Sequence, residues 1–194
     1  MKKRIRRIQQ HLGVAVDGIV GPQTLQAISS ALGIQEIPVW PAQSVVRSCA
    51  SCFGSPGEEE NLVSVVPAYQ LYYEGAPVRS IRVHRLIALH VQQALAEVLE
   101  HYGKEEIQRL GLNQYGGSYN FRATARGKTL SLHAWGIALD FAPASNGLNV
   151  KSPRASLSRP DCAAWWEIWE RHGAVSLGRE RNYDWMHLQF AGLD

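Results

Sequence analysis

The sequence predicts an α+β fold, a small antiparallel sheet with helices packed against it, preceded by a small helical module. Residues 86–102 and 162–172 carry apolar side chains at helical spacing, and each segment ends at a glycine. Three short apolar runs have strand character: GIALDFA from Gly136, AVSLG from Ala174 and WMHLQF from Trp185. Helices and strands do not alternate regularly along the chain, which favours an α+β domain.

The helical module is predicted over residues 4–32 as helix, turn and helix. Apolar residues recur at helical spacing on both sides of a VDGIVGPQT break: Ile5, Ile8 and Leu12 before it, and Leu25, Ile28 and Leu32 after it. Pro22 suits the first turn of the second helix, and Gly33 suits its end.

This stretch resembles the peptidoglycan-binding domain of many cell-wall hydrolases, whose signature is an IQxxLG helix, a DGxxGPxT turn and an apolar helix. The matching residues are Ile8, Gln9, Leu12, Gly13, Asp17, Gly18, Gly21, Pro22 and Thr24. The third helix usual in that family is not visible after Ile34, so a plain helical hairpin packed on its neighbour is the alternative. The resemblance implies peptidoglycan as a partner.

The expected division is a module over residues 1–34, a linker over 35–61 and a catalytic domain over 62–194. The linker segment has three prolines and an acidic triplet, which is typical of linker composition. Its Cys49 and Cys52 form a CxxC step, which is compatible with half of a zinc site, a redox pair or a tightened loop.

Composition excludes several classes of protein. The formal charge of +3 and the absence of a nucleic-acid-binding motif argue against a nucleic-acid partner. The basic start lacks the apolar core of a secretory signal, and no apolar run reaches the ~18 residues that span a bilayer. We therefore expect a monomer made in the cytoplasm without a signal peptide or membrane insertion, which reaches the cell wall only after release.

Two short stretches contain candidate metal ligands. His133 and Asp140 lie in SLHAWGIALDFAP, and Asp184 and His187 lie in YDWMHLQF. Two histidines and a carboxylate are a ligand set of catalytic zinc, which leaves one tetrahedral position for water. Such an ion activates water and polarises a scissile carbonyl, while a further carboxylate, here Asp184, moves the proton.

Convergence of these side chains requires two irregular segments, because side chains alternate along a strand. His133 must lie in a turn before one strand, which Gly136 permits, and Asp184 must lie at a bend near Asn182-Tyr183. Taken singly, each histidine is also compatible with a structural role.

The pattern Ser-x-His-x-x-Gly-x-Ala-x-Asp, followed by Asp-x-x-His, resembles the zinc D-alanyl-D-alanine carboxypeptidase family. That family includes vancomycin-resistance carboxypeptidases and phage endolysins that cut L-alanyl-D-glutamate bonds, and its zinc fold is shared with the hedgehog amino-terminal domain. The matching residues are Ser131, His133, Gly136, Ala138, Asp140, Asp184 and His187. The resemblance runs from about Ile81 to the end of the chain.

The resemblance implies a role for each matching residue. The implied Zn²⁺ ligands are His133, Asp140 and His187. Asp184 is the implied general base, and Arg122 in YNFR would lie beside the ion and hold a substrate carboxylate or the oxyanion. A surface salt bridge is the alternative for Arg122, and Arg126 competes for its role. Ser131 would bind substrate or orient a ligand, or simply form a turn.

The function expected from these features is a zinc-dependent peptidoglycan peptidase that cleaves stem peptides at L-Ala-D-Glu or D-Ala-D-Ala bonds. A phage or prophage endolysin acting during host lysis fits this combination. The alternative is a catalytically inactive zinc-fold protein that binds the cell wall.

Overall fold

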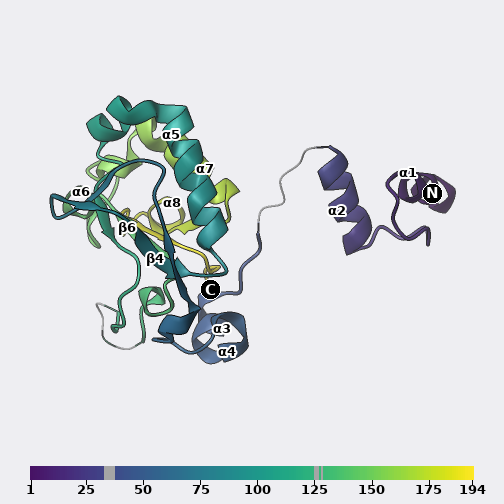
Figure 1. The fold of residues 1–194 in the computed structure, drawn as a ribbon, viewed down its shortest axis with the longest axis horizontal. Helices are drawn as coiled ribbons and strands as arrows, with labels where there is room; N and C mark the ends of the chain where they lie inside the picture. Colours follow the sequence, from purple (N-terminus) through teal and green to yellow (C-terminus); the bar gives the residue numbers. More distant parts are fainter. Residues whose placement is uncertain (33–37, 125–126, 128) are drawn as a thin grey trace. The chain divides into compact units, whose positions relative to one another are not determined.

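The chain forms two compact units, Met1–Pro38 and Val39–Asp194 (Figure 1). The computed structural model describes residues 1–32, 38–124, 127 and 129–194. The expected helix end at Gly33 and the expected boundary between residues 34 and 35 lie outside these described residues. None of the helices that the structure describes is long and apolar enough to cross a membrane.

The first unit contains two helices, α1 (Lys2–His11) and α2 (Pro22–Ala31), joined by a turn. Its centre is polar, because the fully buried Gln9 connects the helix to the turn. The side-chain amide of Gln9 donates to Asp17 Oδ1 at 2.7 Å and to Thr24 Oγ1 at 3.0 Å. Its Oε1 accepts a backbone N–H of the turn at 2.8 Å. These hydrogen bonds connect α1, the turn and the start of α2.

The second unit begins before the expected domain start at Leu62. From Val39 onward, the segment expected as a linker folds into three short helices: α3 (Gln43–Ser48), α4 (Ala50–Phe53) and the 3₁₀ helix η1 (Glu59–Asn61). The physical reason is burial, because Val46 and Phe53 are only 2% and 3% exposed within the core of this unit.

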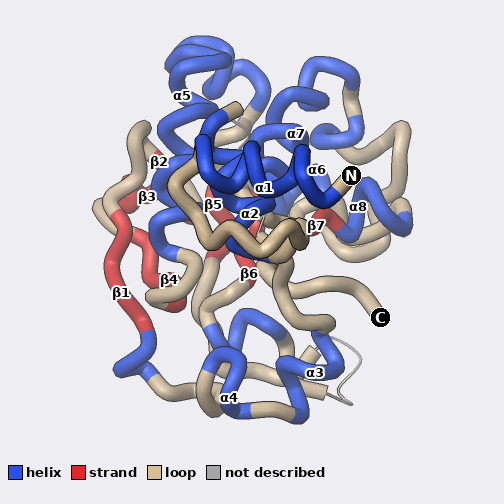
Figure 2. The backbone as a smooth tube through the Cα atoms, turned by 90° about the vertical axis from the view of Figure 1, so that its right-hand side faces the viewer, coloured by secondary structure: helices blue, strands red, loops and turns tan. Residues whose placement is uncertain are grey.

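In the described part of the second unit, the strands form three small antiparallel sheets. Figure 2 draws the strands in red. Two of them are pairs: β1 (Leu62–Val65) with β4 (Ile81–His84), and β2 (Leu71–Tyr73) with β3 (Ala76–Val78). The third has the order β5-β6-β8-β7 and contains β5 (Tyr115–Gly117), β6 (Ala138–Phe141), β7 (Val175–Ser176) and β8 (His187–Gln189). Mixed helices and small antiparallel sheets confirm the predicted α+β class.

Two helices, α5 (Ala88–Leu110) and α7 (Ala163–Arg171), pack side by side against the strands (Figure 1). The helix expected to end at Gly103 does break there, where φ is +67°, but a second helical stretch continues to Leu110. The shorter helical elements are η2 (Leu132–Trp135), α6 (Pro143–Asn146), η3 (Ser156–Ser158), η4 (Pro160–Cys162) and α8 (Leu177–Arg181).

The core beneath the four-stranded sheet is aromatic. Phe141 of β6 packs on Trp165 and Trp169 of α7 at ring-centroid distances of 4.9 and 5.7 Å. Both tryptophans are fully buried. Because side chains alternate along a strand, this packing turns the preceding residue of β6, Asp140, to the opposite face of the sheet.

Candidate metal centre

Asp140 and His187 are directly opposite each other on neighbouring strands. The antiparallel register of β6 and β8 pairs Leu139 with Leu188 and Asp140 with His187. Paired residues place their side chains on the same face, within contact distance. The sheet register therefore supplies two of the predicted ligands from segments 47 residues apart in the sequence.

His133 reaches the same point from η2, the 3₁₀ helix that precedes β6. Ser131 caps this helix, and its Oγ accepts the backbone N–H of His133 at 3.4 Å. Gly136 ends it with φ +68°, a left-handed conformation. A Cβ at Gly136 would approach the Leu62 side chain to 2.6 Å. The turn therefore needs glycine for both its conformation and its space.

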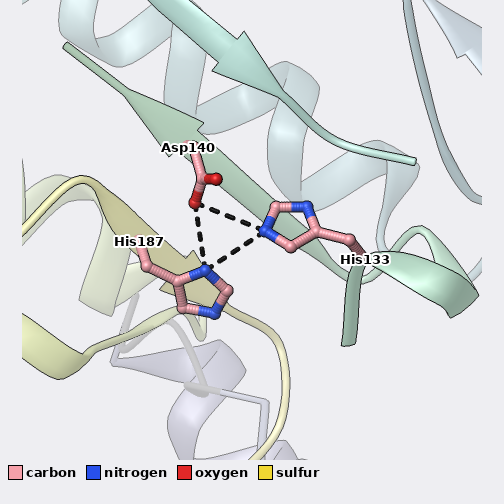
Figure 3. A group of neighbouring side chains, drawn as sticks. All are labelled: His133, Asp140 and His187. Atoms are coloured by element: carbon pink, nitrogen blue, oxygen red, sulfur yellow. Dashed lines mark hydrogen bonds and ion pairs between the residues drawn. The ribbon is translucent and has the colours of Figure 1, made fainter. Parts of the chain in front are cut away.

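The three side chains form a closed triangle of donor atoms (Figure 3). His133 Nε2 lies 3.2 Å from His187 Nδ1 and 3.3 Å from Asp140 Oδ1, and the third edge, from His187 Nδ1 to Asp140 Oδ1, is 3.0 Å. Tetrahedral ligation at ~2.0–2.1 Å places donor atoms about 3.3 Å apart. All three residues are buried, with exposed fractions of 3%, 7% and 8%. This group could hold a metal ion.

Hydrogen bonds fix which nitrogen of each imidazole faces the triangle. The Ser118 carbonyl can only accept, so His133 Nδ1, 2.6 Å away, donates to it and leaves Nε2 with a free lone pair. The Gln189 side chain donates through Nε2 to the Ala191 carbonyl at 2.9 Å, so its Oε1 accepts from His187 Nε2 at 3.3 Å. His187 therefore presents the lone pair of Nδ1.

Three electron-rich atoms thus face one another, an arrangement that a shared cation stabilises. The titration behaviour reflects the same geometry. Burial raises the pKa of Asp140, but the two facing imidazoles, which donate to the carboxylate when they are protonated, outweigh it and hold the pKa well below its ordinary value. Burial lowers the pKa of His187, but the Asp140 carboxylate outweighs it and raises the pKa. The site therefore favours a positive charge at its centre.

Asp184 lies at the bend that was expected before β8. Asn182 and Asp184 both have left-handed backbone conformations, with φ of +51° and +54°. Asp184 is 8% exposed, and its Oδ1 has no hydrogen-bond partner within the described part of the chain. Burial raises the pKa of Asp184, and the opposing charges of His187 and Arg122 offset this only in part. A buried carboxylate with a raised pKa is suited to accept a proton.

Arg122 lies on a loop that runs beside η2. Its backbone carbonyl accepts the Ser131 N–H at 3.1 Å, and Asn120 N–H donates to the His133 carbonyl at 3.0 Å. The Arg122 side chain is exposed and forms no ion pair with any residue that the structure describes. The salt-bridge alternative for Arg122 therefore has no support here, and the competing Arg126 lies outside the described residues.

Two hollows meet at this centre and share Arg122, His133 and Asp140 in their walls. The first hollow has a volume of about 310 Å³ and continues past Arg82, Tyr115 and Tyr119. The second has a volume of about 390 Å³ and is also lined by Ser131, Tyr183 and Asp184. Ser131 thus caps a helix and also faces a hollow.

Two supporting residues, Ser118 and Gln189, were not predicted from the sequence. Gln189 had a usable signal, because it lies two residues after His187 on a strand and so shares its face. Ser118 acts through its backbone carbonyl, which leaves no signal in the residue type. Cys49 and Cys52 do not join a larger group of ligands: among the described residues, the only cluster of three or more candidate ligands is His133, Asp140 and His187.

Comparison with known proteins gives one match. The family model for a peptidoglycan binding domain matches residues 1–28. No curated protein and no solved structure matches the chain. The match supports peptidoglycan as a partner and indicates a role related to the cell wall, in a chain whose second unit contains a group able to hold a metal ion.

Proposed function

We propose that the chain is a zinc-dependent peptidoglycan peptidase of the D-alanyl-D-alanine carboxypeptidase and L-alanyl-D-glutamate endopeptidase type. One observation supports this most strongly: three buried donor atoms lie 3.0–3.3 Å apart, and they share the wall of a hollow with Asp184, whose Oδ1 has no hydrogen-bond partner among the described residues. A purely structural cluster would satisfy its buried polar atoms internally. The peptidoglycan-binding match at residues 1–28 supports the substrate.

Zinc is compatible with this donor set. Imidazole nitrogens with one carboxylate oxygen suit zinc and neighbouring transition ions, whereas magnesium and calcium prefer oxygen ligands alone. When bound, zinc supplies a Lewis acid that polarises a carbonyl and lowers the pKa of water. The residues that would hold it are His133 through Nε2, His187 through Nδ1 and Asp140 through Oδ1.

The other residues of the site handle protons and charge. Asp184 accepts a proton from the attacking water and passes it to the nitrogen of the departing amine, a transfer aided by its raised pKa. Arg122 lines both hollows and forms no ion pair with the described residues, which suits its guanidinium to stabilise the negative charge that develops on the carbonyl oxygen.

The hollows bear on which bond is cut. Each has a volume within the range of ligand-binding pockets, and both border the candidate centre while their other walls are formed by different residues. A stem peptide could therefore extend in both directions. This favours cleavage within the stem, such as at the L-Ala-D-Glu bond, over removal of a terminal D-alanine. We still expect the enzyme to act as an endolysin, which reaches the cell wall during host lysis.

The test is digestion of purified peptidoglycan, with mass spectrometry of the new peptide ends. We expect the zinc-loaded protein to release new ends, and Asp184→Asn to release at least about 100-fold fewer at equal zinc content. Asp161→Asn, which changes an exposed carboxylate outside both hollows, is the matched control and should keep full activity. New L-alanine carboxyl ends would identify the endopeptidase, and free D-alanine the carboxypeptidase.

The alternative, an inactive zinc-fold protein that binds the wall, predicts a different result. The unmodified chain would bind zinc and sediment with the wall, yet release no ends under any metal loading. That outcome would exclude the proposed enzyme. Activity of Asp184→Asn at the unmodified rate would instead exclude Asp184 as the base.

A further inference from the structure

The positive charge of the chain is concentrated in its first unit. Five of the 20 Lys and Arg residues and one of the 17 Asp and Glu residues lie within residues 1–32, so this segment carries a formal charge of +4. The remaining residues, with 15 cations and 16 anions, carry −1. The modest net charge of the whole chain therefore hides a strongly basic small unit. All five of its cations belong to α1: Lys2, Lys3, Arg4, Arg6 and Arg7.

Lys3, Arg4 and Arg7 project from the side of α1 opposite Gln9, whereas Lys2 and Arg6 lie next to Gly18 of the turn. Ile5, Gln9 and Leu12 follow helical spacing on the inward side, where Gln9 is fully buried and the other two are half-buried. All five basic side chains are exposed, and none forms an ion pair with a residue that the structure describes. Within the described residues, this surface is therefore basic and is not neutralised by ion pairs.

The only acidic residue of residues 1–32, Asp17, does not neutralise this surface. Its carboxylate accepts hydrogen bonds from the Gln9 side chain and from the Ile19 N–H at 2.8 Å. Arg6 alone lies close enough to act on it, and that charge helps to lower the pKa of Asp17 after the hydrogen bonds from Ile19 and Gln9. Among the described residues of the unit, four cations are left without a carboxylate partner: Lys2, Lys3, Arg4 and Arg7.

We propose that this basic face of α1 binds an anionic polymer of the cell wall, through the polymer's repeated phosphate or carboxylate groups. Several cations on one short helix can engage successive anionic groups, and such attraction is multivalent and sensitive to salt. The inference adds a binding surface and a ligand chemistry to the peptidoglycan-binding match. It does not depend on the metal centre.

A polymer fits this helix better than a lipid bilayer. Membrane-surface helices insert their apolar face into the bilayer, so that face must be free. Here the inward face of α1 is held within the unit by the hydrogen bonds of Gln9. Of the apolar side chains within α1, only Ile8 is largely exposed, at 46%. The helix therefore offers charge without an insertable apolar surface.

The test measures sedimentation of the full-length protein with purified cell walls. Every protein carries Asp184→Asn, so that the walls stay intact and the result is independent of catalysis. The test variant changes four cations of α1: Lys2→Gln, Lys3→Gln, Arg4→Gln and Arg7→Gln. The matched control removes the same charge from exposed cations of the second unit: Lys104→Gln, Lys151→Gln, Arg154→Gln and Arg159→Gln.

At about 50 mM salt we expect the α1 variant to bind walls at least tenfold more weakly than the control, because each cation near an anionic surface contributes roughly fivefold in affinity. Binding of the parent protein should fall steeply as salt rises. Walls stripped of phosphate polymers by hydrofluoric acid show which anionic group the protein binds. If the protein no longer binds the stripped walls, the ligand is a phosphate polymer. If it still binds them, the ligand is the carboxylate groups of peptidoglycan.

Equal binding by the α1 variant and the control would overturn the proposal. Salt-independent binding of the parent protein would also overturn it, and that measurement needs no variant to fold. Vesicles containing anionic phospholipid form a third arm. Binding to these vesicles without binding to walls would assign the surface to a membrane and reject the polymer.

Discussion

Replacement of Gln189 by leucine tests whether the metal centre depends on the tautomer of His187. Gln189 is 1% exposed, and it holds His187 Nε2 through Oε1 while its own amide is fixed by the Ala191 carbonyl. Leucine has a similar volume but can accept no hydrogen bond. In the Gln189→Leu protein, His187 can rotate or carry its proton on Nδ1, which removes the lone pair from the triangle.

The expected loss of zinc affinity in Gln189→Leu follows from the hydrogen bond between His187 and Gln189. Loss of a hydrogen-bond partner behind a metal-ligating histidine weakens metal affinity by roughly 10–100-fold. The 3.3 Å separation between His187 Nε2 and Gln189 Oε1 is at the long end for an N–H···O bond. We therefore expect the lower figure, about tenfold or ~1.4 kcal/mol in zinc binding. The orphaned groups should also reduce the free energy of unfolding by about 1–3 kcal/mol.

The assay is competition for zinc between metal-free protein and a chelating dye, which needs no enzyme activity. Gln189→Glu separates tautomer control from general destabilisation. It also loses the donor to Ala191, but it keeps an acceptor for His187, so zinc affinity should equal or exceed that of the unmodified protein. Unchanged zinc affinity in Gln189→Leu, or equal losses in both variants, would refute the reasoning.

Two further predictions concern packing and thiols. Gly116→Ala should destabilise the fold by about 1–3 kcal/mol in denaturant unfolding and weaken zinc binding, because its Cβ would lie 2.9 Å from Asp140 Cβ. In the control Gly147→Ala, the new Cβ meets nothing closer than 3.5 Å, so neither the free energy of unfolding nor zinc binding should change. Equal effects of the two substitutions would contradict the steric explanation. Iodoacetamide should modify Cys49, whose pKa is lowered by hydrogen bonds from Ser51, before Cys162, whose pKa burial raises to about 11. Peptide mass spectrometry checks the order, and labelling of Cys162 in the folded protein would contradict it.

The parts of the site that sequence could predict are those that need a particular residue type. Imidazole and carboxylate ligands are recognisable because few other side chains bind zinc, and Gly136 is recognisable because the turn demands it. The bend near Asn182 was also foreseeable, since asparagine tolerates a left-handed backbone. What sequence could not supply was the register of β6 and β8, which decides that Asp140 meets His187.

Other features depend on tertiary contacts that leave a weak local signal. Residues 39–61 have a linker-like composition, yet two of their apolar side chains, Val46 and Phe53, are buried enough to fold the segment into the second unit. The hydrogen bond that orients His133 is accepted by the backbone carbonyl group of Ser118, and every residue has such a group. Glycine at 103 predicted a helix end correctly but gave no warning that a helix resumes after it.

The central claim, that His133, Asp140 and His187 hold one zinc ion, is tested most directly by X-ray absorption at the zinc edge of the loaded full-length protein. We predict one zinc per chain, bound by nitrogen and oxygen donors at about 2.0–2.1 Å, with the scattering pattern of two imidazoles. Sulfur donors at about 2.3 Å would place zinc at Cys49 and Cys52 instead and contradict the proposed site.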